Sequence, residues 1–209
     1  MDLLIGSIFA VFIAIYLIFI KEKYKTKNFK DLWLSILAGI LMCFFALIFE
    51  KTLLYLFELN DLFEAFIIYA ATEEGFKFLS VYLLIFKSKE FSSSYDIIKI
   101  VLLTSLTFAL VENILYVNFY YKEIGLDVAL LRIYTAIPLH AICGISMGYF
   151  IYNYKKTKNK LFLLLSILIP LMIHGSYDYF IITDMIYYSL FVLIISLITH
   201  IIPAKKYFT

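Results

Sequence analysis

The chain has 209 residues, of which 64% are hydrophobic and 19% aromatic, and its mean hydropathy is +0.93. A soluble domain is usually about 45–50% apolar, and a chain this apolar would expose large patches and aggregate in water. The formal net charge is +2 and is divided among short segments, which argues against a nucleic-acid-binding surface. The composition therefore predicts an integral membrane protein.

Seven apolar stretches are long enough, or nearly so, to cross a hydrocarbon core of about 30 Å as helices. They are residues 2–20, 32–57, 62–86, 96–121, 127–153, 161–183 and 185–202. The first stretch has neither a basic segment before it nor a small-residue cleavage site, so we expect a retained span. No loop is long enough to fold alone. We predict an all-α polytopic membrane helix bundle of about seven transmembrane helices, forming one domain over residues 1–209.

Lysines mark alternate loops of this bundle. Thirteen of the 18 Lys and Arg residues fall in 21–30, 87–89, 155–160 and 205–206, whereas the intervening loops are acidic or mixed. This alternation follows the positive-inside rule and predicts an outside N-terminus and a cytoplasmic C-terminus in a cell membrane, most simply a prokaryotic plasma membrane. The lysines would meet anionic lipid headgroups. Cys43 and Cys143 lie in apolar stretches, so we infer no disulfide.

Polar side chains of four consecutive spans fall at the middle of the membrane or in its outer half. A charged side chain at this depth costs at least about 2.5–3.5 kcal/mol, so each one needs an explanation. They are Glu73, Glu74 and Lys77 in the third span, Glu112 and Asn113 in the fourth, His140 in the fifth, and His174 and Asp178 in the sixth. Their common depth predicts one functional site. Glu50 and Lys51 are expected outside it, toward the outer interface.

The spacing of these residues indicates acid–base chemistry. Glu73 and Lys77 are four residues apart and share a helix face, whereas Glu74 lies about 100° away and needs another partner. Two adjacent carboxylates in a low dielectric are not both expected to be ionised. A carboxylate beside a protonated partner suits a general acid and base. His174 and Asp178 are also four residues apart, so the aspartate can orient the imidazole. A purely structural ion pair would not require three acids.

Other features allow two interpretations. Pro138 and Pro170 precede the two histidines, and a proline inside a helix frees a backbone carbonyl near which water fits. The small residues Gly144 and Gly148 are equally consistent with a cavity and with tight helix packing. Sequence patterns of a zinc protease or a serine nucleophile turn are absent, and Asp178 is the only well-buried aspartate, which leaves a two-aspartate mechanism without its partner.

The ordered motifs resemble those of the PrsW family of membrane proteases. The family is itself similar to the prenyl-CAAX endopeptidases of the CPBP group, which share the paired glutamates and intramembrane histidines. The matching motifs are Glu73-Glu74-x-x-Lys77, Phe108-x-x-x-Glu112-Asn113, His140, and His174-x-x-x-Asp178. They cover a core of roughly residues 62–182, with the other spans as scaffold.

The resemblance implies a metal-independent glutamic-type protease without a cofactor. Glu73 or Glu74 would activate water, with Lys77 holding the pair. Glu112 and Asn113 would hold the water or the carboxylates. His140 and His174 would stabilise the oxyanion, and Asp178 would orient His174. The implied partner is a membrane-anchored protein or peptide, such as a single-span anti-sigma factor cut on its extracytoplasmic side.

Two other functions stay open at this point. His140, His174 and Asp178 could supply three ligands of a zinc-dependent seven-span hydrolase of lipid amides. Buried acids and histidines also suit a proton-coupled or other transporter, although no pair of segments resembles an inverted repeat. The sequence fixes neither the oligomeric state nor which glutamate acts as the base.

Overall fold

The computed structural model describes residues 29–87, 93–117 and 125–201, and all the regular secondary structure of these residues is helical. The all-α prediction is therefore confirmed. Four of the helices are long and apolar enough to cross a membrane, namely those over Lys30–Leu56, Ser94–Leu115, Asp127–Thr157 and Lys160–Ile182. The predicted span at 2–20 lies outside the described residues. The total of seven spans and the orientation of the termini stay predictions.

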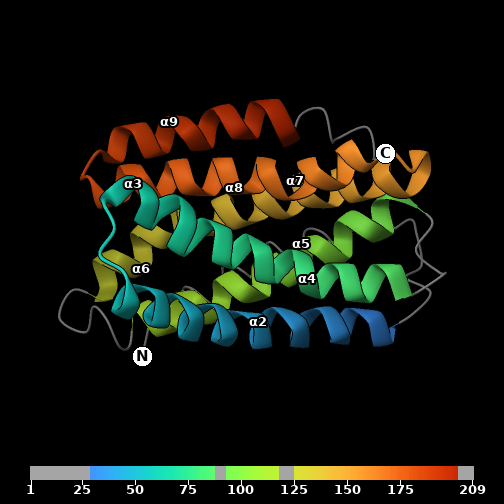
Figure 1. Cartoon of the computed structure of the whole chain (residues 1–209), viewed down its shortest axis with the longest axis horizontal. Helices are drawn as coiled ribbons and strands as arrows, with labels where there is room; N and C mark the ends of the chain where they lie inside the picture. Colours follow the sequence, from blue (N-terminus) through green and yellow to red (C-terminus); the bar gives the residue numbers. More distant parts are fainter. Residues whose placement is uncertain (1–28, 88–92, 118–124, 202–209) are drawn as a thin grey trace.

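The described helices follow one another in the order shown in Figure 1. They are α2 (Phe29–Leu56), α3 (Asp61–Phe63), the π-helical segment η1 (Glu64–Ala70), α4 (Ala71–Lys87), α5 (Ser94–Leu115), α6 (Gly125–Tyr134), α7 (Ala136–Thr157), α8 (Lys160–Ile182), α9 (Ile186–Ser196) and the π-helical segment η3 (Leu197–Ile201). Asn60, Ser93 and Asn159 cap the N-termini of α3, α5 and α8 by accepting backbone N–H bonds. The caps set where these helices begin.

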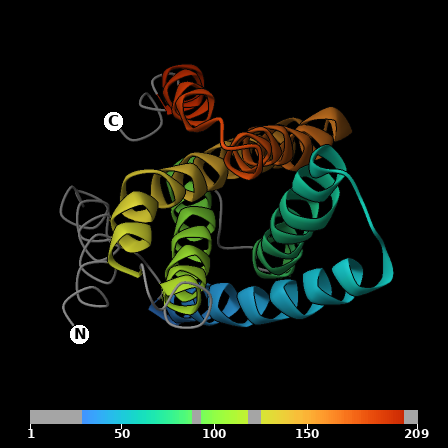
Figure 2. The ribbon, with the colours of Figure 1, turned by 90° about the vertical axis from the view of Figure 1, so that its left-hand side faces the viewer.

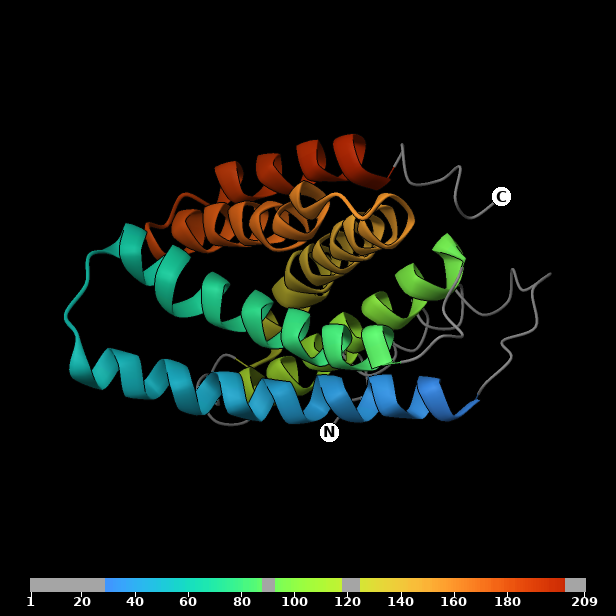
Figure 3. The ribbon, with the colours of Figure 1, turned by 45° about the vertical axis from the view of Figure 1, so that its right-hand side comes forward.

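Helix α5 is the most buried of the four long apolar helices and forms the centre of the bundle. It packs between α2 on one side and α7 on the other, as the end-on view in Figure 2 shows. Helix α4 runs between α2 and α8, and α9 lies against the outer side of α8 (Figure 3). The helices that carry the predicted site residues thus all face one interior.

Glycines let α7 approach α5 closely. A Cβ atom added at Gly144 would lie 2.9 Å from Ser105 Cβ, and one at Gly148 would lie 2.8 Å from Ile98 Cα. Small residues at helix interfaces permit this close contact in lipid, where van der Waals packing holds helices together. Of the two interpretations of these glycines, the structure therefore favours helix packing.

The predicted span over residues 127–153 is divided into α6 and α7 at Thr135. Pro138 explains the division, because it has no N–H for the carbonyl of Tyr134 and its ring crowds that group. The Thr135 hydroxyl donates to the Leu131 carbonyl at 2.8 Å and accepts from the Tyr177 hydroxyl at 2.7 Å. The break thus lies inside the bundle, and the Thr135 hydroxyl there both donates and accepts a hydrogen bond.

The π-helical segment η1 comes directly before Ala71 and the paired glutamates. Its wider turns hold more residues than α-helical turns, so it rotates the face that α4 presents to its neighbours. The segment packs on α8, where a Cβ atom at Gly175 would lie 2.5 Å from the Phe66 ring. Segments of this kind are frequent at functional sites.

We expect Gly148→Ala to destabilise the protein, because the new methyl group meets the backbone of Ile98 and overpacking costs about 1–3 kcal/mol. Thermal unfolding in detergent should show a lower Tm. Gly75→Ala is the matched control, since nothing lies within 4 Å of its Cβ position and alanine favours a helix by about 1 kcal/mol. A wild-type Tm for Gly148→Ala would contradict the packing argument.

Candidate active site

Lys77, on α4, lies at the centre of the buried polar residues. Its Nζ donates to Glu73 Oε2 at 3.1 Å and to Glu74 Oε1 at 2.8 Å, and it lies 2.8 Å from His140 Nδ1. An ammonium group has three N–H donors, so these three acceptors use all of them. Nζ also lies 4.2 Å from the centroid of the Phe108 ring. Glu74, for which the sequence left the partner open, therefore shares Lys77 with Glu73.

His140, on α7, is held through both ring nitrogens. Because Lys77 can only donate, His140 Nδ1 accepts this bond, and Nε2 therefore carries the proton and donates to Glu112 Oε2 at 2.9 Å. The backbone carbonyl of His140 accepts a bond from the Ser105 hydroxyl at 2.7 Å. These contacts fix the ring and its tautomer.

Arg132, on α6, completes this side of the site. Its Nη2 lies 2.8 Å from Glu112 Oε1, and its Nε donates to Asn113 Oδ1 at 2.6 Å. The guanidinium also lies over the Tyr116 ring, 4.1 Å from its centroid. Arg132 belongs to none of the sequence motifs. One signal could have found it, because Arg132 falls beside a predicted outer loop, where the positive-inside rule does not expect a cation.

His174, on α8, lies among three carboxyl groups. Its Nδ1 donates to Glu74 Oε1 at 2.9 Å, while its Nε2 is 3.4 Å from Asp178 Oδ2 and 3.9 Å from Glu73 Oε2. The ring meets that of His140 edge to face, with centroids 5.1 Å apart. In contrast to His140, His174 has only one short hydrogen bond through its ring.

The structure thus brings all eight predicted site residues into one buried network. A continuous series of contacts runs from α8 through α4 and α7 to α5 and α6. In order, it joins Asp178, His174, Glu74, Lys77, His140, Glu112 and Arg132, with Glu73 bound to Lys77 and Asn113 bound to Arg132. Every helix from α4 to α8 contributes a member.

The two adjacent glutamates differ in their surroundings. Glu74 has no exposed surface, and its Oε1 accepts bonds from both Lys77 and His174. Glu73 is 6% exposed and accepts a single hydrogen bond, from Lys77, among the residues that the structure describes. Glu73 is therefore the carboxylate that a small molecule can reach more easily.

Glu50, on α2, is a further buried acid that the sequence did not indicate. We expected it toward the outer interface, but it is only 5% exposed, and it interacts electrostatically with Glu73 and Glu112. No hydrogen-bond partner for its Oε1 lies among the described residues. Since α2 is apolar around its whole circumference, the sequence has no periodic pattern to show that Glu50 points inward.

Comparison with known proteins identifies the family of the chain. A family model described as PrsW family intramembrane metalloprotease matches residues 27–201. A Protease PrsW of Clostridioides difficile (strain 630) is 28% identical over 187 residues, covering 86% of this chain and 79% of the relative. One of Halalkalibacterium halodurans is 31% identical over 180 residues, covering 85% and 82%. One of Shouchella clausii (strain KSM-K16) is 37% identical over 133 residues, covering 63% and 60%.

No solved structure matches the chain. The helical bundle, the buried acids and histidines, and the sequence matches together define an intramembrane peptidase. The chain belongs to the PrsW family of intramembrane proteases.

The description of the family implies a metal, and the side chains allow a test of whether they fit one. Ligand atoms of Glu73, Glu74, His140 and His174 lie within 4.8 Å of one another, and Asp178 is not part of this group. However, the ammonium of Lys77 is bonded to three of the four. Zinc binds its nitrogen and oxygen ligands at about 2.0–2.2 Å, so the ammonium would have to leave first. As arranged, the residues fit a lysine and not a metal ion.

We expect Lys77→Met to destabilise the protein strongly, because two carboxylates and an imidazole would lose their shared donor. Removing one partner of a buried ion pair costs about 3–5 kcal/mol. The measurement is thermal unfolding in detergent. The double variant Lys77→Met/Glu74→Gln should recover part of the loss, since it also removes a negative charge. An unchanged Tm in Lys77→Met would mean that the ammonium does not hold the site.

Proposed function

We propose that this protein is a metal-independent, glutamic-type intramembrane endopeptidase. It hydrolyses a peptide bond in or next to the transmembrane segment of a membrane-anchored protein. The observation that carries the proposal is the pairing of the less deeply buried carboxylate, Glu73, with the fixed Lys77 and the loosely held His174. Family membership favours this activity over a transporter and over a hydrolase of lipid amides.

Glu73 acts as the general base in this proposal. It takes a proton from a water molecule while the water oxygen bonds to the scissile carbonyl carbon. The protonated Glu73 then gives that proton to the amide nitrogen as the carbon–nitrogen bond breaks, which releases an amine and a carboxylic acid. Such positioned proton transfer contributes about 10²–10⁴-fold to rate. The single hydrogen bond of Glu73 supports this assignment over Glu74.

His174 is the better candidate for stabilising the oxyanion. Among three carboxyl groups the ring takes the imidazolium form, in which Nε2 also carries a proton. This N–H makes only longer contacts, at 3.4 and 3.9 Å, so it can donate to a substrate oxygen. His140 has both nitrogens engaged at 2.8 and 2.9 Å, which supports a positioning role for it. Asp178 orients His174 through the longer contact.

The remaining residues hold the charges in place. Lys77 keeps the carboxylates of Glu73 and Glu74 next to each other despite their repulsion. Glu112 lies between Arg132 and His140 and bonds to both, and Asn113 fixes Arg132. Preorganised groups of this kind need no rearrangement during the reaction.

A metal-dependent form of the same peptidase is the second candidate. It is favoured by the four ligand atoms within 4.8 Å of one another and by the wording of the family description. The two forms make opposite predictions for metal content. They agree on the bond that is cut.

For the setting of the reaction, we propose a multi-pass protein of the cell membrane with its N-terminus outside. The lysine-rich loops support that orientation, and the four apolar helices support the lipid environment. The resemblance to the PrsW family suggests a single-span regulator similar to an anti-sigma factor as the substrate. The outer-half position of the acids suits a cut on the extracytoplasmic side.

Glu73→Gln should abolish cleavage, with a loss of about 10²–10⁴-fold, because an amide cannot accept the proton of water. The assay is co-expression with candidate single-span membrane proteins, followed by separation of the fragments. His174→Ala should lower the rate by about 10²–10³-fold, as expected for loss of an oxyanion donor. A Tm equal to that of the wild type in both variants shows that the loss of cleavage is not a loss of folding. Undiminished cleavage by folded Glu73→Gln would refute the glutamate mechanism.

Metal chelation should have little effect on cleavage. We expect 1,10-phenanthroline to leave the rate unchanged, and elemental analysis of active protein to find far less than one metal ion per chain, because Lys77 holds the ligand atoms. Zinc or another metal at one ion per chain, lost together with activity and restored with it, would replace this reading by the metal-dependent one.

A further inference from the structure

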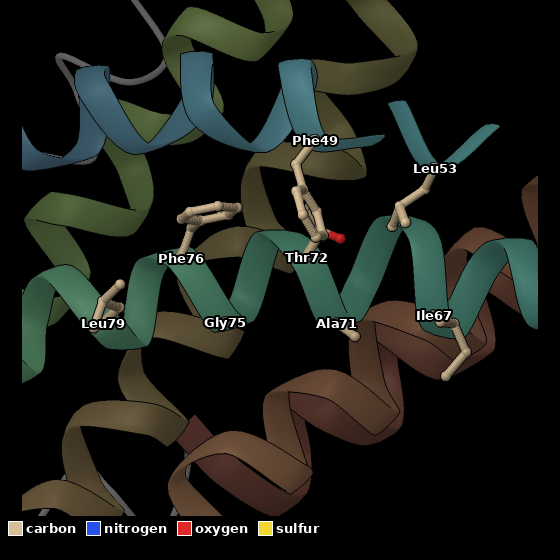
Figure 4. Close-up of a pocket in the computed structure, with 8 residues that line it drawn as sticks. All are labelled: Phe49, Leu53, Ile67, Ala71, Thr72, Gly75, Phe76 and Leu79. Carbon is tan, nitrogen blue, oxygen red and sulfur yellow. The ribbon is translucent and has the colours of Figure 1, made fainter. Parts of the chain in front are cut away.

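An open groove lies between α2 and α4, on the outside of the bundle. It holds about 320 Å³, and its walls are almost entirely apolar. The lining residues, labelled in Figure 4, are Phe49, Leu53, Ile67, Ala71, Thr72, Gly75, Phe76 and Leu79. Phe49 and Leu53 come from α2, and the others come from η1 and α4 (Figure 4). The groove is separate from the polar network, since Lys77 lies about 200° round α4 from Gly75.

One side of the groove is a row of residues spaced four positions apart along η1 and α4, which we call the Ile67–Leu79 ridge. It consists of Ile67, Ala71, Gly75 and Leu79. Its two ends, Ile67 and Leu79, are about half exposed, so the ridge faces away from the protein interior. Its middle has the small-xxx-small pattern that lets a second helix approach closely in a membrane. The shape suits a helix that crosses α4 at this point.

Packing within the described part of the chain does not explain why a glycine occupies position 75. A Cβ atom at Gly39, Gly144, Gly148 or Gly175 would come within 2.9 Å of a neighbouring heavy atom, so helix packing explains those four. At Gly75, nothing lies within 4 Å. A glycine inside a helix costs about 1 kcal/mol relative to alanine, and one of its uses is the close approach of a ligand to the backbone.

Thr72 is the one polar side chain among the eight that line the groove. The whole residue is 6% exposed, and its hydroxyl is in none of the hydrogen bonds among the residues that the structure describes. Figure 4 shows this hydroxyl on the side of α4 that faces Phe49 and Leu53. The hydroxyl oxygen is not among the fully enclosed polar atoms without a partner, so it opens into the groove, where lipid tails offer no hydrogen bond and a ligand with a polar group would supply one.

A lipid acyl chain does not explain these features, because it offers no hydrogen-bonding group to Thr72 and does not require a glycine. A transmembrane helix with small residues explains both, since its backbone approaches Gly75 and its polar groups reach the hydroxyl. Thr72 and Gly75 also immediately flank Glu73 and Glu74 in the sequence, so a docked helix would lie at the depth of the carboxylates.

We propose that the groove formed by α2 and the Ile67–Leu79 ridge is the docking site for the transmembrane helix of the substrate. The identity of the partner rests on the proposed peptidase function. Docking on the outer face of α4 holds the substrate, and the segment that continues from its helix supplies the bond that is cut. Binding and chemistry are thus divided between two faces of one helix.

Cross-linking in vesicles tests the proposal directly. A photo-reactive phenylalanine analogue replaces Phe49 in the groove, or Phe191 on the exposed side of α9 as the control. The probes are two synthetic single-span peptides, one with a Gly-xxx-Gly face and one with both of these glycines replaced by leucine. We expect position 49 to capture the glycine peptide about tenfold more than the leucine peptide, with no such difference at position 191.

Substitutions in the groove provide the second measurement. Gly75→Leu should abolish this preference and raise KM for a cleaved single-span substrate about tenfold, with little change in kcat. Thr72→Val should act in the same direction, and Thr72→Ser should restore the preference because it keeps the hydroxyl. Equal capture of both peptides, capture of lipid alone, or an unchanged KM in folded Gly75→Leu would overturn the docking site.

The outcomes also separate this proposal from the glutamate mechanism. If Glu73→Gln cleaves normally while capture still depends on Gly75, the mechanism fails and the docking site stands. If cleavage requires Glu73 but neither capture nor KM responds to Gly75, the docking site alone is refuted.

Discussion

The position of one ammonium group determines the rest of the site. Lys77 is almost completely buried, and its three donors go to two carboxylates on its own helix and to an imidazole on α7. An unpaired charge at this depth would be too costly to keep, so α4 and α7 must hold these acceptors together. Buried ion pairs seldom add net stability. Close packing, as between α5 and the glycines of α7, is the better source of it, and the ion pairs give the site its geometry.

The network has a rigid side and a looser side. From Lys77 toward α6, the contacts through His140, Glu112 and Arg132 are all between 2.8 and 2.9 Å. From Lys77 toward the C-terminal part of α8, the last contact, between His174 and Asp178, lengthens to 3.4 Å. Groups that meet a substrate must be able to exchange partners, whereas groups that position them should not. The asymmetry therefore agrees with the roles proposed for the two histidines.

The sequence alone predicts much of this arrangement, because a charge within an apolar stretch is conspicuous. Helical spacing correctly pairs Glu73 with Lys77, and the common depth of the polar residues predicts that their helices form one site. Spacing cannot reveal which way a uniformly apolar helix is turned, and for this reason it does not place Glu50 among the buried acids. Arg132 lies near a loop and carries no motif. The break at Thr135 depends on a proline three residues later, so a window of average hydropathy does not detect it.

The π-helical segment before the glutamates makes the site depend on chain length as well as on side chains. Segment η1 accommodates its extra residue while packing against α8. If the same seven residues formed an ordinary α-helix, with no wide turn to absorb the extra residue, everything after Ala71 would turn by about 100° relative to α3. Every acid and histidine would still be encoded, but they would no longer meet. Among homologues, a single-residue gap within this segment should therefore coincide with loss of the wide turn, so that the acids keep their orientation.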